Sequence, residues 1–243
     1  MKLFLFRVAN WLYSSNYPFY YFLYKHWKAI ADRKERKIVQ LILRPGMIVV
    51  DIGANIGVYT RFFSRLVGSE GTVHCFEPDP INFNRLKRNV GSLRNVLAIP
   101  SAVGERTGSV KLYTSDEMNV DHRTFDSGDG RKSIDVPLVA LDDYFPSGQR
   151  IDFIKIDVQG YEMNVLLGAK RILTENTDVK ILMEFWPFGL KKASVNADHV
   201  MILLKSLGFS IVSIEGYPDE EFSPDELKCF SATSYCNVLI SRK

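Results

Sequence analysis

Short apolar runs alternate along this chain with stretches whose apolar residues recur every three or four positions. The runs of four to seven residues predict strands, and the periodic stretches predict helices. We expect strands at Met47–Val50, Thr72–Phe76, Val96–Ile99, Ile151–Ile156, Val179–Phe185, Phe209–Ile214 and Tyr235–Ile240. We expect helices at Ala31–Arg44, Val58–Val67, Pro80–Asn89, Tyr161–Leu173 and Ala197–Leu207. Such alternation predicts an α/β fold with a mostly parallel seven-stranded sheet flanked by helices.

One segment departs from this alternation. Ser109–Tyr113 and Ile134–Leu138 predict a hairpin-like excursion, and the residues between them, 114–133, are polar and rich in turn formers. Loops of this length without structure of their own are usually functional or disordered. Asn119 and His122 in this loop are therefore candidates for contact with a ligand.

Polar residues follow several of the predicted strands where each strand ends. They are Asp51, Glu77, Ser101, Asp157 and Glu184. In open parallel sheets, ligands bind in the crevice beyond the carboxyl ends of the strands. We therefore expect these five residues to meet in one crevice.

The loop after the first strand indicates which ligand binds there. Gly53 and Gly57 lack a Cβ, so the backbone can turn sharply and approach a ligand. A dinucleotide loop reads G-x-G-x-x-G and holds a pyrophosphate, whereas this loop reads G-x-x-x-G. The carboxylate of Asp51 would repel a diphosphate but suits a ligand with an ammonium group, and Glu77 can accept two hydrogen bonds from a ribose diol. These features favour S-adenosylmethionine. The cofactor-binding candidates are Asp51, Gly53, Ala54, Asn55, Gly57, Tyr59, Thr60, Glu77, Pro78 and Asp157.

Three blocks stand in order along the chain: DIGANIG at 51–57, FEPDP at 76–80 and IKIDVQGYE at 154–162. Together with 165–169 and 181–184 they resemble the FkbM family of class I methyltransferases. The resemblance covers about residues 46–185 and implies a Rossmann-like fold with S-adenosylmethionine as cofactor. It also implies that the adenine rests near the end of the third strand, by Ser101 and Ala102. Because the family is associated with O-methylation of natural products and saccharides, the resemblance suggests a hydroxyl acceptor on a small molecule or glycan.

The chain departs from that family at one position. The third block usually reads Asp-Val-Glu-Gly, and here Gln159 replaces the glutamate. A glutamine cannot act as a base and is a poor ligand for a hard cation, so we expect no metal site.

The catalytic candidates are Asp157, which follows the fourth strand, and His122, whose ordinary pKa suits proton removal near neutral pH. A surface histidine is the alternative for His122, and a carboxylate that only holds a loop is the alternative for Glu184. We expect Asn119, Gln159, Glu184 and Trp186 to contact the acceptor.

The N-terminal region is aromatic and then basic. Residues 1–30 hold 11 of the 30 aromatic residues, and residues 25–37 hold six lysines and arginines. These features fit helices that pack on the sheet or line the pocket, but also an interfacial membrane anchor that gives peripheral contact with a membrane. We expect a helical extension at 1–44 and a methyltransferase domain at 45–243.

Composition limits the other classes of function. The net charge of +3 does not indicate a nucleic-acid binder, and three scattered cysteines indicate a reducing, cytoplasmic compartment. Two further functions stay open from the sequence. One is a non-catalytic S-adenosylmethionine-binding or nucleoside-binding protein, and the other is an NAD-dependent oxidoreductase, against which the glycine spacing argues.

Overall fold

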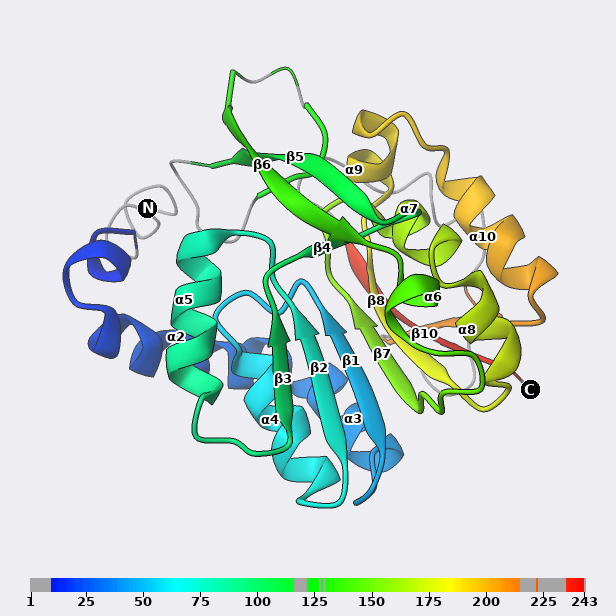
Figure 1. The fold of residues 1–243 in the computed structure, drawn as a ribbon, viewed down its shortest axis with the longest axis horizontal. Coiled ribbons are helices and arrows are strands. Elements are labelled where there is room, and N and C mark those ends of the chain that lie inside the picture. Colours follow the sequence, from blue (N-terminus) through cyan, green and yellow to red (C-terminus); the bar gives the residue numbers. More distant parts are fainter. Residues whose placement is uncertain are drawn as a thin grey trace.

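A computed structural model describes residues 10–115, 122–126, 128, 130–214, 222 and 235–242. Within them, seven strands form one sheet in the order β3-β2-β1-β7-β8-β10-β9 (Figure 1). The strands are β1 (Ile48–Ile52), β2 (Thr72–Phe76), β3 (Val96–Ile99), β7 (Phe153–Ile156), β8 (Lys180–Phe185), β9 (Ser210–Ser213) and β10 (Cys236–Ser241). β10 runs antiparallel to both of its neighbours, and all other pairs of strands in this sheet are parallel. The predicted mostly parallel seven-stranded sheet is confirmed.

Helices cover both faces of this sheet. They are α3 (Arg33–Ile42), α4 (Val58–Val67), α5 (Pro80–Val90), α6 (Leu141–Tyr144), α7 (Glu162–Leu167), α8 (Lys170–Glu175) and α10 (Ala197–Ser206). On one face, α3 and α4 pack Val39 and Phe63 against the strands. On the other face, α7, α8 and α10 pack residues such as Leu166 and Leu204. Because both faces are covered, β7 is buried along its whole length, as expected for a central parallel strand.

A second, smaller sheet stands beside the carboxyl ends of the central strands. β5 (Gly108–Thr114) pairs antiparallel with β6 (Lys132–Val139), which confirms the predicted hairpin, and β4 (Ala102–Val103) pairs parallel with β6. Figure 1 shows this sheet above the ends of β1, β2 and β3. The excursion therefore lies next to the expected crevice.

One predicted helix is wrong. The stretch Tyr161–Leu173 was expected as a single helix but forms α7 and α8, separated at Gly168. The Gly168 carbonyl accepts a hydrogen bond from the backbone N–H of Asp142, at 2.9 Å. The Asp142 carboxylate in turn accepts from the backbone N–H groups of Arg171 and Ile172, at 2.8 and 3.0 Å, and so caps α8. A contact from a distant loop thus ends one helix and starts the next.

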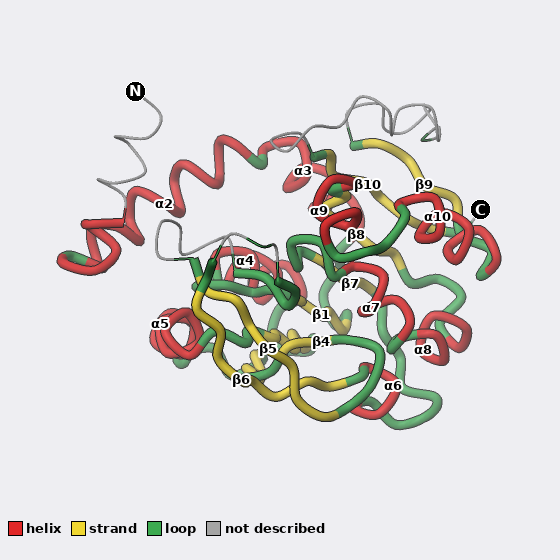
Figure 2. The backbone as a smooth tube through the Cα atoms, turned by 90° about the horizontal axis from the view of Figure 1, so that it is seen from above, coloured by secondary structure: helices red, strands yellow, loops and turns green. Residues whose placement is uncertain are grey.

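A further helix lies along the edge of the molecule. In α2 (Tyr17–Ala31), the side chain of Asn16 accepts a hydrogen bond from the N–H of Phe19 and caps the first turn. Tyr20 packs with Ile56 and Val58, and Figure 2 shows α2 running beside α4 before α3 begins. The division of the chain at residue 44 stays a prediction.

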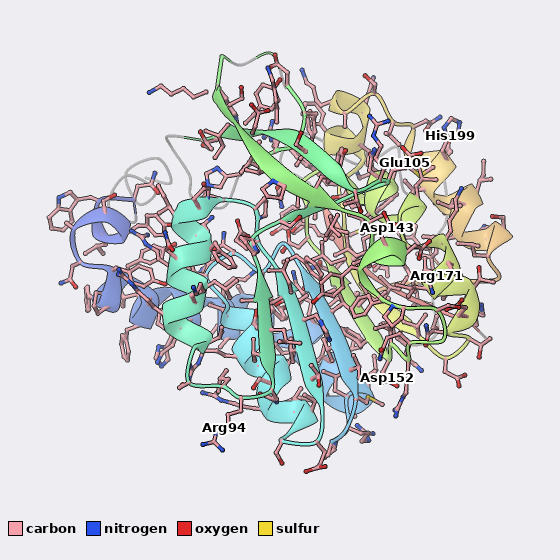
Figure 3. The ribbon with its side chains drawn as sticks, in the orientation of Figure 1. Arg94, Glu105, Asp143, Asp152, Arg171 and His199 are labelled. Carbon is pink, nitrogen blue, oxygen red and sulfur yellow. The ribbon has the colours of Figure 1, made fainter. Side chains whose placement is uncertain are left out.

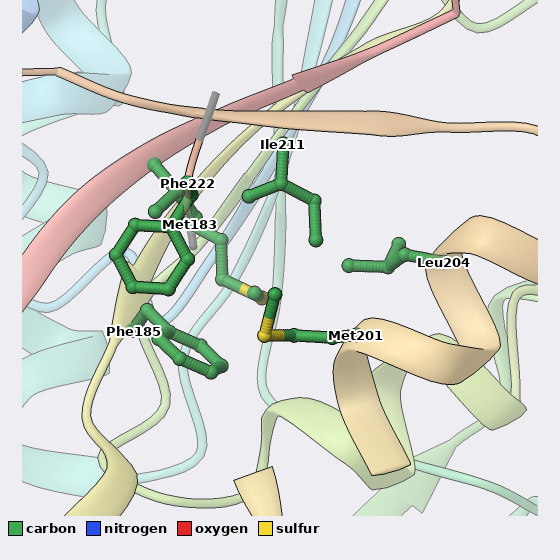
Figure 4. Close-up of a pocket in the computed structure, with 7 residues that line it drawn as sticks. Met183, Phe185, Met201, Leu204, Ile211 and Phe222 are labelled. Carbon is green, nitrogen blue, oxygen red and sulfur yellow. The ribbon is translucent and has the colours of Figure 1, made fainter. Parts of the chain in front are cut away.

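The core between α10 and the strands β8, β9 and β10 encloses a narrow apolar gap (Figure 4). Its lining includes Met183, Phe185, Met201 and Phe222, and it has no room for a water molecule. We interpret this gap as core packing rather than a ligand site.

Candidate active site

The glycine loop after β1 is shaped by close backbone contacts. Gly53 has φ +78°, and a Cβ placed there would lie 1.9 Å from the carbonyl oxygen of Asp157. Gly57 has φ +85°, and a Cβ there would lie 2.7 Å from Leu86 Cδ1. Any other residue at either position would have to displace its neighbour, so the loop geometry requires both glycines.

Asp51 lies at the bottom of this loop and is fully buried. Its Oδ2 accepts a hydrogen bond from Thr60 Oγ1 at 2.6 Å, whereas its Oδ1 is buried without a hydrogen-bond partner. Burial raises the pKa of this carboxyl, although Lys155 and Thr60 oppose the rise. An oxygen in this state can accept a hydrogen bond from a cationic ligand group.

Glu77 follows β2 and closes the other side of the loop. Its Oε2 accepts from the backbone N–H of Asn55 at 2.8 Å, and its Oε1 accepts from the N–H of Asp79 at 3.0 Å. Burial raises the pKa of Glu77 to about 8, although these hydrogen bonds oppose the rise. The two backbone bonds orient the carboxyl, and the side chain of Asn82 also hydrogen-bonds to it. A carboxylate has about four lone-pair sites, so one remains for a ribose hydroxyl. Pro78 beside it is half-buried.

Ser101 and Ala102 lie where β3 leads into β4. Ser101 is buried, and its hydroxyl donates to the carbonyl oxygens of Ala102 at 2.8 Å and Pro137 at 3.0 Å. This hydroxyl therefore ties the main sheet to the small sheet. Ala102 is buried in the small sheet.

A lysine that the sequence analysis did not select connects Asp51 with Asp157. Lys155 is the register partner of Asp51 on the neighbouring strand, so the two side chains project from the same face. Its Nζ lies 2.8 Å from Asp157 Oδ2. Burial alone would lower the pKa of Lys155, but the carboxylates of Asp157 and Asp51 raise it. Burial alone would raise the pKa of Asp157, but Lys155 and then Lys28 lower it. Asp157 is thus held ionised.

Gln159 joins the two strand ends. It has φ +54°, and its Nε2 donates to Asp157 Oδ1 at 3.1 Å and to Glu184 Oε1 at 2.7 Å. Burial, and after it the charge of Asp157, raise the pKa of Glu184 to about 8. Both carboxylates are half-buried, so a ligand can reach them. Two neighbouring acids whose pKa values are driven apart are a common feature of catalytic sites.

A third acid lies behind this pair. Glu162 starts α7, is fully buried and accepts from the backbone N–H of Gly160 at 2.8 Å through Oε1. Its Oε2 has no partner, and burial raises the pKa of this carboxyl to about 7. Among the residues that the structure describes, no three His, Cys, Asp or Glu side chains are grouped to hold a metal ion.

The loop between β5 and β6 approaches the same edge. The guanidinium of Arg123 lies 5.3 Å from the centre of the Trp186 ring. Trp186 is buried at the start of α9 (Pro187–Lys192), and its Nε1 has no hydrogen-bond partner. Phe125 lies so close to Gly160 that a Cβ there would be 2.9 Å from its ring. Asn119 lies outside the described residues.

His122 is also in this loop, but its ring is already engaged. Its Nδ1 accepts a hydrogen bond from the backbone N–H of Ser115 at 3.1 Å. In a neutral imidazole the other nitrogen then carries the hydrogen, so this arrangement makes Nε2 a donor. His199, by contrast, is exposed on α10, away from the strand ends (Figure 3).

Helix α2 contributes two residues that sequence reasoning missed. The charges of Asp157 and Glu184 are among the causes that raise the pKa of Tyr24, after burial and Tyr20, so Tyr24 lies within electrostatic range of both carboxylates. Lys28 lies one turn further along α2, with its Nζ 5.7 Å from the centre of the Tyr59 ring. The spacing of Tyr20, Tyr24 and Lys28 by four residues was the available signal, because it places all three on one helical face.

Comparisons with known proteins show the family of this chain. The family model for the methyltransferase FkbM domain matches residues 51–211. The chain is 32% identical over 158 residues to 2-O-methyltransferase NoeI of Sinorhizobium fredii, an alignment that spans 58% of this chain and 64% of that protein. It is 27% identical over 219 residues to methyltransferase sdnD of Sordaria araneosa, which spans 76% of this chain and 80% of the relative. It is 39% identical over 83 residues to 31-O-demethyl-FK506 methyltransferase FkbM of Streptomyces tacrolimicus, which spans 34% of this chain and 28% of that protein.

Solved structures give the same fold. A Streptococcus mutans protein crystallised with S-adenosylhomocysteine matches with a TM-score of 0.52 at 14% identity and covers 86% of this chain and 96% of its own. A candidate rRNA methylase of Clostridium thermocellum matches with a TM-score of 0.52 at 13% identity and covers 86% and 93%. The cofactor is S-adenosylmethionine rather than a dinucleotide. The chain belongs to the FkbM family of S-adenosylmethionine-dependent methyltransferases.

Proposed function

We propose that this protein transfers the methyl group of S-adenosylmethionine to a hydroxyl group of a small molecule or saccharide. The observation that carries the proposal is the Gln159 amide, which donates to both Asp157 and Glu184 beside the glycine loop. This arrangement supports the proposal because it holds an ionised and a protonated carboxyl side by side, next to the glycine loop.

The residues around the loop fit the cofactor. The unpartnered Oδ1 of Asp51 can accept from the ammonium group of the methionine part, and Glu77 can accept from the ribose diol. Gly53 lets the loop pass close to the backbone of Asp157, where any Cβ would collide with the Asp157 carbonyl oxygen. When bound, S-adenosylmethionine supplies an electrophilic methyl group on a cationic sulfur.

The acceptor hydroxyl needs a base, and we assign this role to Glu184. Its pKa of about 8 lies near the working pH, where a carboxylate of that basicity can take a proton from an alcohol during transfer. Asp157 stays ionised beside Lys155, and Gln159 holds the two carboxyls in a fixed relation. His122 is a weaker candidate because its Nδ1 accepts from Ser115.

Two observations support a polar acceptor with an apolar face. The Trp186 N–H has no partner and can donate to an acceptor oxygen, and the Tyr24 hydroxyl lies near the carboxylates. Aromatic rings of this kind also bind the apolar face of a sugar. The names of two relatives, a 2-O-methyltransferase and a 31-O-demethyl-FK506 methyltransferase, support transfer to oxygen.

The test is methyl transfer from labelled S-adenosylmethionine to a panel of hydroxylated acceptors, followed by locating the label. We expect O-methyl products, and kcat/KM that rises with pH and levels off above about 8, because Glu184 must be deprotonated to act as a base. The Glu184→Gln variant should have a kcat at least about a hundredfold lower than wild type, because a general base contributes that much or more. Its kcat/KM should also no longer rise with pH. S-adenosylhomocysteine binding by calorimetry should stay intact.

An exposed acid elsewhere supplies the matched control: Glu105→Gln should behave as wild type. Methyl transfer to nitrogen or carbon would contradict the proposal, and so would an unchanged pH profile in Glu184→Gln. Cofactor binding without transfer to any acceptor would favour a non-catalytic binding protein.

A further inference from the structure

Within the described part of the chain, the outer face of α2 is exposed and mostly apolar, with His26 as an exposed polar residue among its apolar side chains. The tyrosines of α2 face the rest of the protein. The large apolar side chains on the other side of this helix are exposed, with exposed fractions from 43% for Leu23 to 77% for Ile30. The exposed set on α2 is Phe19, Phe22, Leu23, Trp27 and Ile30, and Trp11 on the preceding helical residues is 65% exposed. The spacing of the five residues on α2 gathers them on one side of that helix. We call these six residues the outer apolar face.

This concentration is unusual for the described surface. The other exposed large apolar residues are scattered singly over different elements, for example Leu97 on β3, Ile134 on β6 and Ile202 on α10. Single exposed apolar residues are normal, whereas a contiguous patch marks an interaction site. The outer apolar face is therefore a candidate interaction surface.

The charges beside this face all have the same sign. Among described residues 10–44, the exposed charged side chains are Lys25, Arg33, Lys34, Lys37 and Arg44. Arg33, Lys34 and Lys37 belong to α3, with a spacing that places them on one helical face, and Arg44 lies two residues after the end of that helix. The two acids of this region are half-buried and engaged: Asp32 pairs with Lys28 at 2.7 Å, and Glu35 accepts from Asn237 at 2.7 Å. Figure 2 shows α2 and α3 along the same edge of the molecule.

We propose that this edge docks on the surface of an anionic lipid bilayer. The outer apolar face would enter the boundary between headgroups and acyl chains, and the lysines and arginines would contact the anionic headgroups. None of the described helices is long and apolar enough to cross a membrane, so α2 would lie in the plane of the surface. A second copy of the chain fits less well, because a twofold axis through this face would bring the basic side chains of both copies together.

Docking would also position the active site. The inner face of the same helix carries Lys28, whose Nζ lies 5.7 Å from the centre of the Tyr59 ring. The Nζ of Lys155, which pairs with Asp157, lies 4.8 Å from the centre of the same ring. The bilayer would therefore adjoin the end of the sheet where we place the acceptor. The docking proposal does not depend on the chemistry proposed above, because it is tested by binding alone.

The experiment is co-sedimentation of the full chain with vesicles of phosphatidylcholine alone and with about 30% phosphatidylserine. We expect binding to the anionic vesicles that weakens with salt, since the electrostatic part is screened. Phe19→Gln/Leu23→Gln/Ile30→Gln should lower the partition coefficient at least about tenfold, because three large apolar side chains no longer leave water. Lys34→Glu/Lys37→Glu should lower it at least about tenfold on anionic vesicles only.

Matched variants keep the comparison specific. Leu97→Gln/Ile134→Gln/Ile202→Gln and Lys170→Glu/Lys205→Glu alter exposed residues elsewhere and should bind vesicles as wild type. Trp27 gives a second readout, since an exposed indole emits at shorter wavelength once it leaves water. S-adenosylhomocysteine binding of each variant reports whether it is folded.

Three outcomes would overturn the proposal. Wild type that stays in the supernatant with anionic vesicles would exclude docking. Equal binding by wild type and the outer-face variant would place the contact elsewhere. A dimer in sedimentation velocity that the outer-face variant dissociates, without vesicle binding, would show that the face joins two copies of the chain.

Discussion

Gln159 links the two carboxyls of the candidate active site. Its amide is a donor, and it donates to Asp157 and to Glu184 at the same time. These bonds hold the two carboxyls close together, while Lys155 keeps Asp157 ionised and burial and the charge of Asp157 favour the neutral form of Glu184. A glutamate at this position would offer no such donor and would add a third acid to the pair. The glutamine at position 159 thus replaces a negatively charged side chain with one that hydrogen-bonds to both carboxyls.

A Gln159→Glu variant tests this interpretation. Added negative charge should raise the pKa of Glu184, so the rise of kcat/KM should move to higher pH than about 8. The lost hydrogen bonds should also lower the free energy of unfolding by about 1–3 kcal/mol. The measurements are a pH–rate profile and urea unfolding, with Gln40→Glu on the exposed face of α3 as control. A profile identical to that of wild type would mean that Gln159 does not influence the base.

At the scale of helices and strands, the sequence predicted those elements whose ends are marked by nearby residues. The bounds Val58–Val67, Thr72–Phe76 and Val96–Ile99 agree with α4, β2 and β3, because glycines and apolar runs mark those ends locally. The break between α7 and α8 depends on the Asp142 carboxylate, which no local pattern near residue 168 reveals. Helix α9 was also missed.

Some residues of the candidate site could be predicted from local sequence signals, and others could not. Asp51, Glu77, Asp157 and Glu184 could be found from their positions at strand ends. Lys155 could not, because it lies inside an apolar strand and its role depends on register with a strand about a hundred residues earlier. Tyr24 and Lys28 come from a helix far away in sequence, and only the packing of α2 brings them to the site.

The junction of the loop with β7 gives the prediction at this scale. A Gly53→Ala variant should lower the free energy of unfolding by about 2 kcal/mol or more and weaken S-adenosylhomocysteine binding at least about tenfold. The reason is that a Cβ would lie 1.9 Å from the Asp157 carbonyl oxygen, so the loop must move. Gly46→Ala is the matched control, because Gly46 has φ +82° and nothing lies within 4 Å of its Cβ position. The Gly46→Ala control should lower the free energy of unfolding by about 1 kcal/mol and leave S-adenosylhomocysteine binding unchanged. Equal losses in both variants would attribute the effect to φ alone.

For the whole molecule, three buried or half-buried acids at one edge of the sheet oppose the stability of the fold. Burial raises the pKa of Glu77 and Glu184 to about 8 and that of Glu162 to about 7. An acid whose pKa is higher in the folded state than in the unfolded state holds a proton that the unfolded state has lost. Stability therefore falls as pH rises from the ordinary pKa to the raised one. We interpret this as the cost of an edge built to receive a cationic cofactor.

Glu162 allows the loss of stability with rising pH to be measured at an acid to which we assign no contact with cofactor or acceptor. Its carboxyl should lower the free energy of unfolding by about 3 kcal/mol between pH 4.5 and about 7, with no further change above that pH. Glu162→Gln keeps an oxygen for the N–H of Gly160 but does not titrate, so its stability should fall less over this interval. Urea unfolding at a series of pH values gives the difference between the two proteins. Glu175→Gln is the control, because hydrogen bonds from Gly148 and Ser147 lower the pKa of Glu175, and its contribution should have the opposite sign. Parallel curves for wild type and Glu162→Gln would show that Glu162 titrates alike in the folded and unfolded states.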